Sequence, residues 1–371
     1  MEIIHLVLGK ANPDRMNGVN KVVHQLAVEQ TAAGKEVRVW GITGNPVHDY
    51  GARNFSTRLF RSCKNPFGIN RELRKAIKDM RGLAVFHLHG GWIPVFYKIS
   101  RLLAKHEIPF VFTPHGAYNT IAMQRSKLVK KHYFHWIEKP MLRRAHIIHC
   151  IGESEVQGPK RIFPGARTAL TPYGFTAGTR DAGHTNAPDE KFIVGFVGRL
   201  DIYTKGLDLL LEVFAGFVGK YPDSQLWIVG DSAEKKALEA AISIRKLHDR
   251  VILWGSKFGQ EKSDLMHQMH IFAHPSRNEG LPASIIEASS MGIPCLVTQA
   301  TNMGDPVRRY QCGMVVENEN VNMLYEAMVK LRTQWDIDRF RSAGERAKSM
   351  VLNEYNWSRI VGEFDKLYSV S

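Results

Sequence analysis

Short apolar runs alternate with helical patterns along the chain, which is typical of a parallel α/β protein. Residues 3–8 are apolar except for His5 and predict a strand that is buried on both faces. After a loop at residues 9–18, apolar residues recur at helical spacing as far as Gly34, a residue type that often ends a helix. The next apolar run, residues 37–42, completes a strand–helix–strand unit.

This pattern continues to residue 172 and begins again after residue 190. Residues 178–190 are rich in Gly, Asp, Asn and Pro and predict a linker. We therefore predict two Rossmann-like, doubly wound α/β domains, at residues 1–177 and 178–354. The further expected elements are strands at 84–89, 109–115, 147–151, 168–172, 192–197, 225–229, 251–254, 271–273 and 294–298, and helices at 207–218, 233–246 and 283–291.

Two glutamates, Glu279 and Glu287, flank the start of the predicted helix 283–291. Pro282 suits the first helical position, and the unpaired amides of that turn favour an anion such as a diphosphate. Carboxylates beside a phosphate repel it, so we expect them to accept hydrogen bonds from sugar hydroxyls. For either glutamate alone, an ordinary surface position is an open alternative.

Two cations lie on the loop between the predicted strand 192–197 and helix 207–218. The segment runs Gly198-Arg199 and then, after five residues, Lys205-Gly206. Arg binds phosphate through two parallel hydrogen bonds, and Lys supplies a mobile point charge. Neither a P-loop nor a Gly-x-Gly-x-x-Gly segment after a strand is present, which argues against P-loop NTPases and nicotinamide dehydrogenases.

Charge and cysteine content narrow the class of protein. The net charge is +14, and residues 1–180 carry all of the excess, with 28 Lys and Arg against 11 Asp and Glu. The four cysteines are scattered, which favours free thiols in a reducing compartment. The apolar run 3–8 is too short for a signal peptide or a membrane span, so we expect a cytoplasmic protein.

The basic excess is greatest at residues 125–144, where cations alternate with Trp136 and other apolar residues. Two interpretations stay open. The segment is either an amphipathic helix on the anionic inner face of the membrane, or a helix whose apolar side packs inward. A nucleic-acid-binding role would also explain the charge, but the sequence has no aromatic platform or reading motif, and we expect no nucleic-acid partner.

Three of the histidines that lie in predicted strands of the first domain, or at their ends, are candidates for a functional site. His87 and His89 alternate onto one face of a strand, but neither a carboxylate nor a cysteine accompanies them, and we predict no metal. His115 ends a strand directly before Gly116, where a side chain can reach a ligand.

Taken together, Gly-Arg-x5-Lys-Gly, Glu-Gly-Leu-Pro-x4-Glu-Ala, Pro-His-Gly and the early glycine-containing loop resemble the family 4 retaining glycosyltransferases of the GT-B fold. The resemblance spans nearly the whole chain. It implies that the two domains face a central cleft and that the final helix, within residues 355–371, crosses back onto the first domain. The chain departs from the family at Asn17-Gly18, where Gly-Gly is common, and at Tyr173, where Asn is common.

The resemblance also implies roles for individual residues. Arg199 and Lys205 would hold the diphosphate, Glu279 and His115 would contact the transferred sugar, and Glu287 would bind the ribose. The first domain would bind the acceptor and the second the nucleotide sugar. The remaining donor-binding positions would be Gly18, Gly198, Ser256, Lys257, Phe258, Gly280, Leu281, Pro282 and Ser284.

We accordingly expect a retaining hexosyltransferase that moves a sugar from a nucleotide diphosphate sugar, a UDP-sugar by preference, to a hydroxyl of a glycan or lipid-linked acceptor, with no cofactor beyond that co-substrate. No nucleophile is evident, which favours a front-face route. Three enzyme alternatives stay open: a retaining glycosidase, a nucleotide-sugar epimerase and a sugar phosphorylase. In a glycosidase, Arg199 and Lys205 would have no role in the reaction. A non-enzymatic polyanion-binding protein is the fourth.

Overall fold

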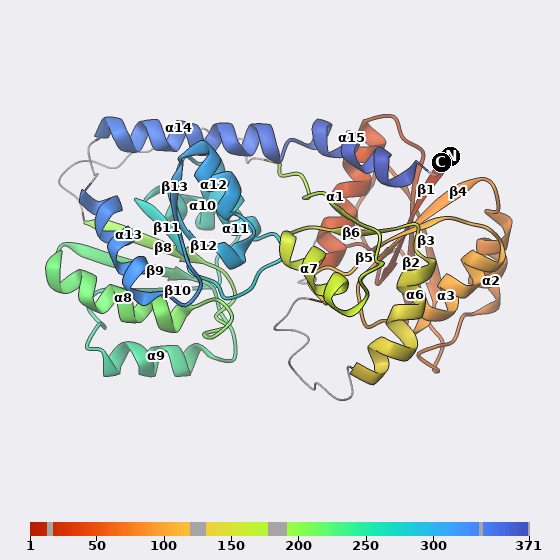
Figure 1. Ribbon diagram of the computed structural model, residues 1–371, viewed down its shortest axis with the longest axis horizontal. Coiled ribbons are helices and arrows are strands. Elements are labelled where there is room, and N and C mark those ends of the chain that lie inside the picture. The colour runs from red at the N-terminus through yellow and green to blue at the C-terminus, as the bar shows by residue number, and fades with distance from the viewer. Residues whose placement is uncertain (13–17, 119–130, 177–190, 334–336, 370–371) are drawn as a thin grey trace. The chain divides into compact units, whose positions relative to one another are not determined.

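The computed structural model describes residues 1–12, 18–118, 131–176, 191–333 and 337–369, and the chain forms two compact units (Figure 1). Unit 1 contains residues 1–174 and 357–371, and unit 2 contains residues 175–356. The boundaries predicted from the sequence are 177/178 and 354/355. The predicted linker 178–190 lies outside the described residues.

Unit 1 is built on a seven-stranded parallel sheet in the order β3-β2-β1-β4-β5-β6-β7. The inner strands are almost wholly buried, which explains their continuous apolar sequences. Its elements are β1 (Glu2–Leu8), α1 (Gly18–Ala32), β2 (Val37–Thr43), β3 (Ser56–Arg61), α2 (Arg71–Asp79), β4 (Ala84–His89), α3 (Pro94–Lys105), β5 (Phe110–Thr113), the π-helix η1 (Phe134–Glu138), α6 (Lys139–Arg144), β6 (Ile147–Cys150), α7 (Glu153–Ile162), β7 (Thr168–Leu170) and α15 (Trp357–Tyr368).

The last helix, α15, belongs to unit 1 although it is the end of the chain. It packs beside α1 (Figure 1). The apolar side of α15 is buried, and its Phe364 ring stacks on Tyr173 at 5.9 Å between centroids. Gly174 fits directly under Trp357, since a Cβ at that position would lie 2.3 Å from the indole ring.

Unit 2 repeats the same topology with six parallel strands in the order β10-β9-β8-β11-β12-β13. In this unit α14 packs on α11 and α12 (Figure 1). Its elements are β8 (Phe192–Val197), α8 (Leu207–Lys220), β9 (Ser224–Val229), α9 (Lys235–Ile244), β10 (Val251–Gly255), α10 (Gly259–His267), β11 (Ile271–His274), α11 (Ala283–Ser290), β12 (Cys295–Thr298), the 3₁₀ helix η2 (Gln299–Thr301), α12 (Gly304–Tyr310), β13 (Gly313–Val316), α13 (Val321–Thr333) and α14 (Ile337–Glu354).

The predicted fold class, two doubly wound parallel α/β domains, is confirmed. Both sheets reverse their strand order beside the first strand, between β1 and β4 and between β8 and β11. Ligands of such sheets bind outside the carboxyl ends of the strands at this reversal. The loops that follow β8 and β11 are those that contain Arg199, Lys205 and Glu279.

The basic segment is described from residue 131 onward, and residues 125–130 lie outside the described part of the chain. Phe134 and Leu142 are buried in the core of unit 1, which agrees with an inward-packing apolar side. Trp136 is 67% exposed and points away from that core. None of the helices in the described ranges is long and apolar enough to cross a membrane.

Candidate nucleotide-sugar site

The loop after β8 and the loop after β11 are joined by backbone contacts in unit 2. The amide of Arg277 donates to the carbonyl of Thr204 at 2.9 Å. Gly206 has φ +67°, and a Cβ there would lie 2.1 Å from the carbonyl oxygen of Pro275. Only glycine allows this approach without a shift of the backbone. The two loops are therefore held together before any side chain is considered.

Arg277 strengthens the same junction with its side chain. Its guanidinium donates to both carboxylate oxygens of Asp208, at 2.7 and 2.8 Å, and to the carbonyl of Tyr203 at 2.6 Å. Glu319 accepts from its Nε at 2.5 Å. The Arg277 side chain is only 8% exposed, so these contacts fix the position of the loop that carries Lys205.

Glu279 is the centre of this site. One of its carboxylate oxygens accepts hydrogen bonds from Lys205 Nζ at 2.5 Å, His274 Nε2 at 2.8 Å and Ser276 Oγ at 2.8 Å. Burial raises the pKa of Glu279, but the hydrogen bond from His274 and the charge of Lys205 outweigh burial and lower the pKa to about 2. Glu279 is therefore a carboxylate, able only to accept hydrogen bonds, throughout the physiological pH range.

His274 supports Glu279 from the end of β11. Its ring stacks on Phe196 and on Phe272, with centroid distances of 5.2 and 6.0 Å. Burial lowers the pKa of His274, although Glu279 opposes this effect, so the ring is neutral and donates through Nε2–H. Its buried Nδ1 has no hydrogen-bond partner among the described residues.

Helix α11 begins at Ala283, as predicted, but the expectation that Pro282 is the first helical residue is wrong. Pro282 is the N-cap residue, with φ −78° and ψ 100°. Its backbone is extended and therefore lies outside the helix, and no side chain caps the helix. The first amides of α11, including that of Ser284, keep the character expected of an anion site.

The loop between Glu279 and α11 is held by Asn302. Its side-chain amide donates to the carbonyls of Glu279 and Gly280, both at 2.7 Å. Asn302 has φ 58°, a left-handed conformation that asparagine tolerates better than most residues. Leu281, which follows, is half-buried against the core of the unit. The backbone of residues 279–281 is thus fixed beside the helix end.

Glu287 lies one turn into α11 and pairs with Lys262 of α10 at 2.7 Å. Arg199 behaves differently from Lys205. Its side chain is 70% exposed and contacts Asp201 at 3.3 Å, so the structure brings Lys205, but not Arg199, onto Glu279.

The other predicted donor-binding positions of unit 2 lie on the same sheet edge. Gly198 follows β8, and its amide donates to the carbonyl of Val229 at 3.0 Å. Ser256, Lys257 and Phe258 form the turn between β10 and α10. Phe258 is 62% exposed, and Lys257 makes a loose contact with Glu261 at 3.5 Å. An exposed aromatic ring beside a phosphate site can stack on a base.

The remaining two predicted residues, Gly18 and His115, belong to unit 1. Gly18 is the first residue of α1, and a Cβ there would meet none of the described atoms within 4 Å. Its predicted neighbour Asn17 lies outside the described residues. His115 follows β5 with φ 52° and is succeeded by Gly116 with φ +81°. Its ring stacks on Tyr173, with centroids 5.8 Å apart.

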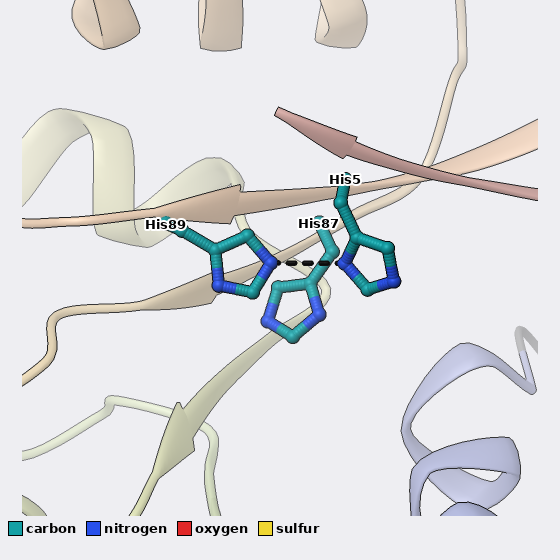
Figure 2. A group of neighbouring side chains, drawn as sticks. All are labelled: His5, His87 and His89. Carbon is teal, nitrogen blue, oxygen red and sulfur yellow. Dashed lines mark hydrogen bonds between the residues drawn. The ribbon is translucent and has the colours of Figure 1, made fainter. Parts of the chain in front are cut away.

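Unit 1 also contains a buried group of histidines that includes His87 and His89 (Figure 2). The predicted shared face of these two is confirmed, and His5 of β1 joins them because it pairs with His87 in the sheet. One nitrogen from each ring lies within 4.8 Å of the others, close enough for a metal. Both nitrogens of each ring already have hydrogen-bond partners. The absence of a metal stays a prediction.

Several residues that hold the site were not identified from the sequence. They are Lys262, His274, Ser276, Arg277 and Asn302. His274 and Ser276 lie at the carboxyl end of β11. That position could have identified them, because parallel sheets bind ligands at the carboxyl ends of their strands. The partners of Arg277 and Lys262 are distant in sequence, and nothing in the pattern of one chain indicates such pairs.

Comparisons with known proteins identify the family of the chain. The family model "Glycosyltransferase Family 4" matches residues 16–163, and "Glycosyl transferases group 1" matches residues 179–350. The GDP-mannose:cellobiosyl-diphosphopolyprenol alpha-mannosyltransferase of Xanthomonas campestris is 25% identical over 77% of this chain and 73% of its own length.

The phosphatidylinositol N-acetylglucosaminyltransferase gpi3 subunit of Schizosaccharomyces pombe is 29% identical over 37% of this chain, and the match covers 28% of the yeast protein. Among solved structures, Anabaena HepE in complex with UDP and glucose has a TM-score of 0.70 and 16% identity, and the alignment covers 99% of this chain and 98% of HepE. This likeness shows a shared fold. With one model matching most of each unit, the chain belongs to the family 4 glycosyltransferases of the GT-B fold.

Proposed function

We propose that the protein is a retaining glycosyltransferase that transfers a hexose or related sugar from a nucleotide diphosphate sugar to a hydroxyl of a glycan or lipid-linked acceptor. The observation that carries this proposal is the contact between Lys205 and the ionised Glu279, beside the uncapped start of α11. A cation, a helix N-terminus and a hydroxyl-binding carboxylate at one point match the parts of a sugar diphosphate.

In the proposed complex, Lys205, Arg199 and the first amides of α11 stabilise the charge that develops on the leaving diphosphate. Arg199 is exposed, and Asp201 is its one ion-pair partner in the described part of the chain, so it can turn toward the phosphates at little cost. Glu279 accepts from sugar hydroxyls, and Glu287 accepts from the ribose. We propose that His115 contacts the transferred sugar. Unit 1, to which His115 belongs, would bind the acceptor.

We propose that the anomeric configuration is retained, and the roles of these groups support a front-face route. Lys205 and Arg199 act on the leaving group. We assign no residue as a nucleophile at the anomeric carbon. A front-face transfer needs none, because the departing phosphate oxygen takes the proton of the acceptor hydroxyl as that hydroxyl attacks. NMR of the purified product measures the anomeric configuration directly. An inverted product would contradict this route.

We favour UDP as the nucleotide of the donor. The solved HepE complex contains UDP, whereas the Xanthomonas relative is named for GDP-mannose. Thermal unfolding with UDP-, GDP- and ADP-sugars separates these donors, because a ligand at 100 times its Kd stabilises the folded protein by about 2.7 kcal/mol. If a GDP-sugar stabilises the protein and UDP- and ADP-sugars do not, the donor nucleotide is GDP and not UDP. The proposed transfer reaction would be unaffected by that result.

Lys205→Ala tests the assigned chemistry. We expect turnover at saturating donor to fall about 10²–10³-fold, equivalent to roughly 3–4 kcal/mol of lost transition-state stabilisation. Lys236→Ala is the matched control, because Lys236 is an exposed lysine of α9 in the same unit. Nucleotide release should require the acceptor. Equal turnover in both variants would contradict the role of Lys205.

We infer where in the cell the protein acts from the exposed side chains of unit 1. We place the protein in the cytoplasm, against the anionic inner face of the membrane when the acceptor is lipid-linked. The exposed Trp136 beside the cations of α6 is the supporting feature. Co-sedimentation with anionic vesicles should weaken for Trp136→Ala. Unchanged co-sedimentation would contradict this surface.

A further inference from the structure

The buried histidines of unit 1 are linked into one continuous series of hydrogen bonds. At one end, His149 Nε2 lies 2.7 Å from the carbonyl oxygen of Thr171, and His149 Nδ1 lies 2.7 Å from Thr113 Oγ1. Thr113 Oγ1 lies 2.6 Å from His87 Nε2, and His87 Nδ1 lies 2.9 Å from the hydroxyl of Tyr368.

The series continues through α1 to the end of β5. The side-chain nitrogen of Gln30 lies 3.3 Å from the Tyr368 hydroxyl, and its oxygen lies 2.7 Å from His5 Nε2. His5 Nδ1 lies 2.9 Å from His89 Nε2, the contact drawn in Figure 2. His89 Nδ1 lies 3.1 Å from His115 Nε2.

All five imidazoles are neutral. Burial lowers the pKa of His5 and of His149 to about 4 and that of His115 to about 3, and it lowers the pKa values of His87 and His89 well below the usual range. A neutral imidazole donates through one nitrogen and accepts through the other. The direction of one bond in the series therefore determines the next.

The carbonyl of Thr171 sets that direction because a carbonyl can only accept. His149 must donate through Nε2 and accept through Nδ1, so Thr113 donates to His149. Thr113 then accepts from His87 Nε2–H, and His87 Nδ1 accepts from Tyr368. The hydroxyl oxygen of Tyr368 in turn accepts from the amide nitrogen of Gln30.

The same logic carries the direction to His115. The amide oxygen of Gln30 accepts from His5 Nε2–H, His5 Nδ1 accepts from His89 Nε2–H, and His89 Nδ1 accepts from His115 Nε2–H. The Nδ1 of His115 is left as a lone pair. None of the described residues is hydrogen-bonded to that atom, and His115 is partly exposed.

We propose that this one-way series, fixed at Thr171 and passed on by Tyr368 and Gln30, holds His115 in the Nε2–H tautomer, so that Nδ1 accepts a hydrogen bond from a hydroxyl of the bound sugar. The second half of this statement rests on the proposed function, because it takes a sugar hydroxyl to be the partner of His115. Gln30 and Tyr368 are positioning residues and do not touch the sugar.

The direct test is ¹⁵N NMR of the histidine rings, in which protonated and bare imidazole nitrogens have widely separated shifts. All five rings should be Nε2–H tautomers at pH 7, with no sugar added. A Nδ1–H signal from His5, His89 or His115 would overturn the series. Loss of the His5 and His89 Nε2–H signals on adding equimolar ZnCl₂ would also overturn it, in favour of a metal site.

Tyr368→Phe interrupts the series with little change in volume. His149 should stay Nε2–H because Thr171 still anchors it, whereas His5, His89 and His115 should become mixtures of tautomers because nothing orients the amide of Gln30. Tyr97→Phe, a change in the same unit outside the series, should alter none of these signals. Unchanged tautomers in Tyr368→Phe would overturn the role of Tyr368.

The kinetic consequence separates this inference from the proposed function. If half of the Tyr368→Phe molecules carry the wrong tautomer, kcat/KM should fall about twofold. Deoxygenated donors, each lacking one sugar hydroxyl, identify the partner of Nδ1. The deoxy donor that lacks it should react equally well with wild type and Tyr368→Phe. If the tautomers are as stated but every deoxy donor keeps the twofold difference, the sugar contact fails while the series stands.

Discussion

Glu279→Gln tests how unit 2 keeps its central carboxylate ionised. The change removes the charge while nearly preserving size. The Glu279 side chain is 11% exposed, so solvent screens its interactions little. Its pKa is lowered from 4.5 to about 2 by His274 and Lys205, against burial, and at 1.36 kcal/mol per pKa unit this is worth about 3 kcal/mol of folding free energy.

The sign of the pH dependence follows from the direction of the shift. A carboxyl group with a lowered folded-state pKa stabilises the fold fully above its unfolded pKa, near 4.5, and the stabilisation is lost as the pH falls toward 2. Wild type should therefore exceed Glu279→Gln in stability by about 3 kcal/mol at pH 7. The difference should shrink steadily below about pH 4.5.

Urea titrations read by hydrogen exchange on peptides of β8 and β11 report unit 2 separately from unit 1. Glu287→Gln is the matched control, because Glu287 is 20% exposed and has a lysine partner at 2.7 Å. We expect it to cost less than about 1 kcal/mol. A Glu279→Gln effect equal at pH 7 and pH 3.5, or no larger than that of Glu287→Gln, would refute the reasoning.

Three further changes test the loops of unit 2. Gly206→Ala should cost about 2 kcal/mol or more in thermal unfolding, because the new Cβ would lie 2.1 Å from the Pro275 carbonyl oxygen at a positive φ. Arg277→Met should destabilise unit 2 by about 2 kcal/mol, measured by hydrogen exchange, because it leaves Asp208 without its bidentate partner. Phe258→Ala should raise the KM for the donor while kcat and the unfolding temperature stay the same, since its ring is 62% exposed.

The strands at the centre of both sheets were predictable because burial on both faces leaves a continuous apolar run. Two edge strands were not predicted. In β3 (Ser56–Arg61) only the adjacent Leu59 and Phe60 are buried, and β13 (Gly313–Val316) has only four residues, of which three are half-buried. An edge strand has one sheet neighbour, so its sequence carries less of the apolar signal.

The approach of Lys205 to Glu279 was also predictable, because each follows a strand next to the point where the strand order reverses. The contacts that hold the two residues there were not predictable from the sequence. The junction depends on Gly206 passing under Pro275 and on the buried guanidinium of Arg277. These contacts join residues about 70 positions apart, and hydrophobic periodicity contains no information on such pairs.

The choice of glutamine at position 30 follows from the direction of hydrogen bonding in unit 1. Gln30 must accept from His5 and donate to Tyr368, and an amide does both without titrating. A glutamate at this position would accept only. Tyr368 would then have to donate to it and accept from His87, which would reverse the bonds as far as His149. That ring also donates to the Thr171 carbonyl, so it would need a second proton in a site where burial lowers its pKa to about 4. A buried carboxylate therefore forces either a charged His149 or a broken hydrogen bond, and the neutral amide avoids both.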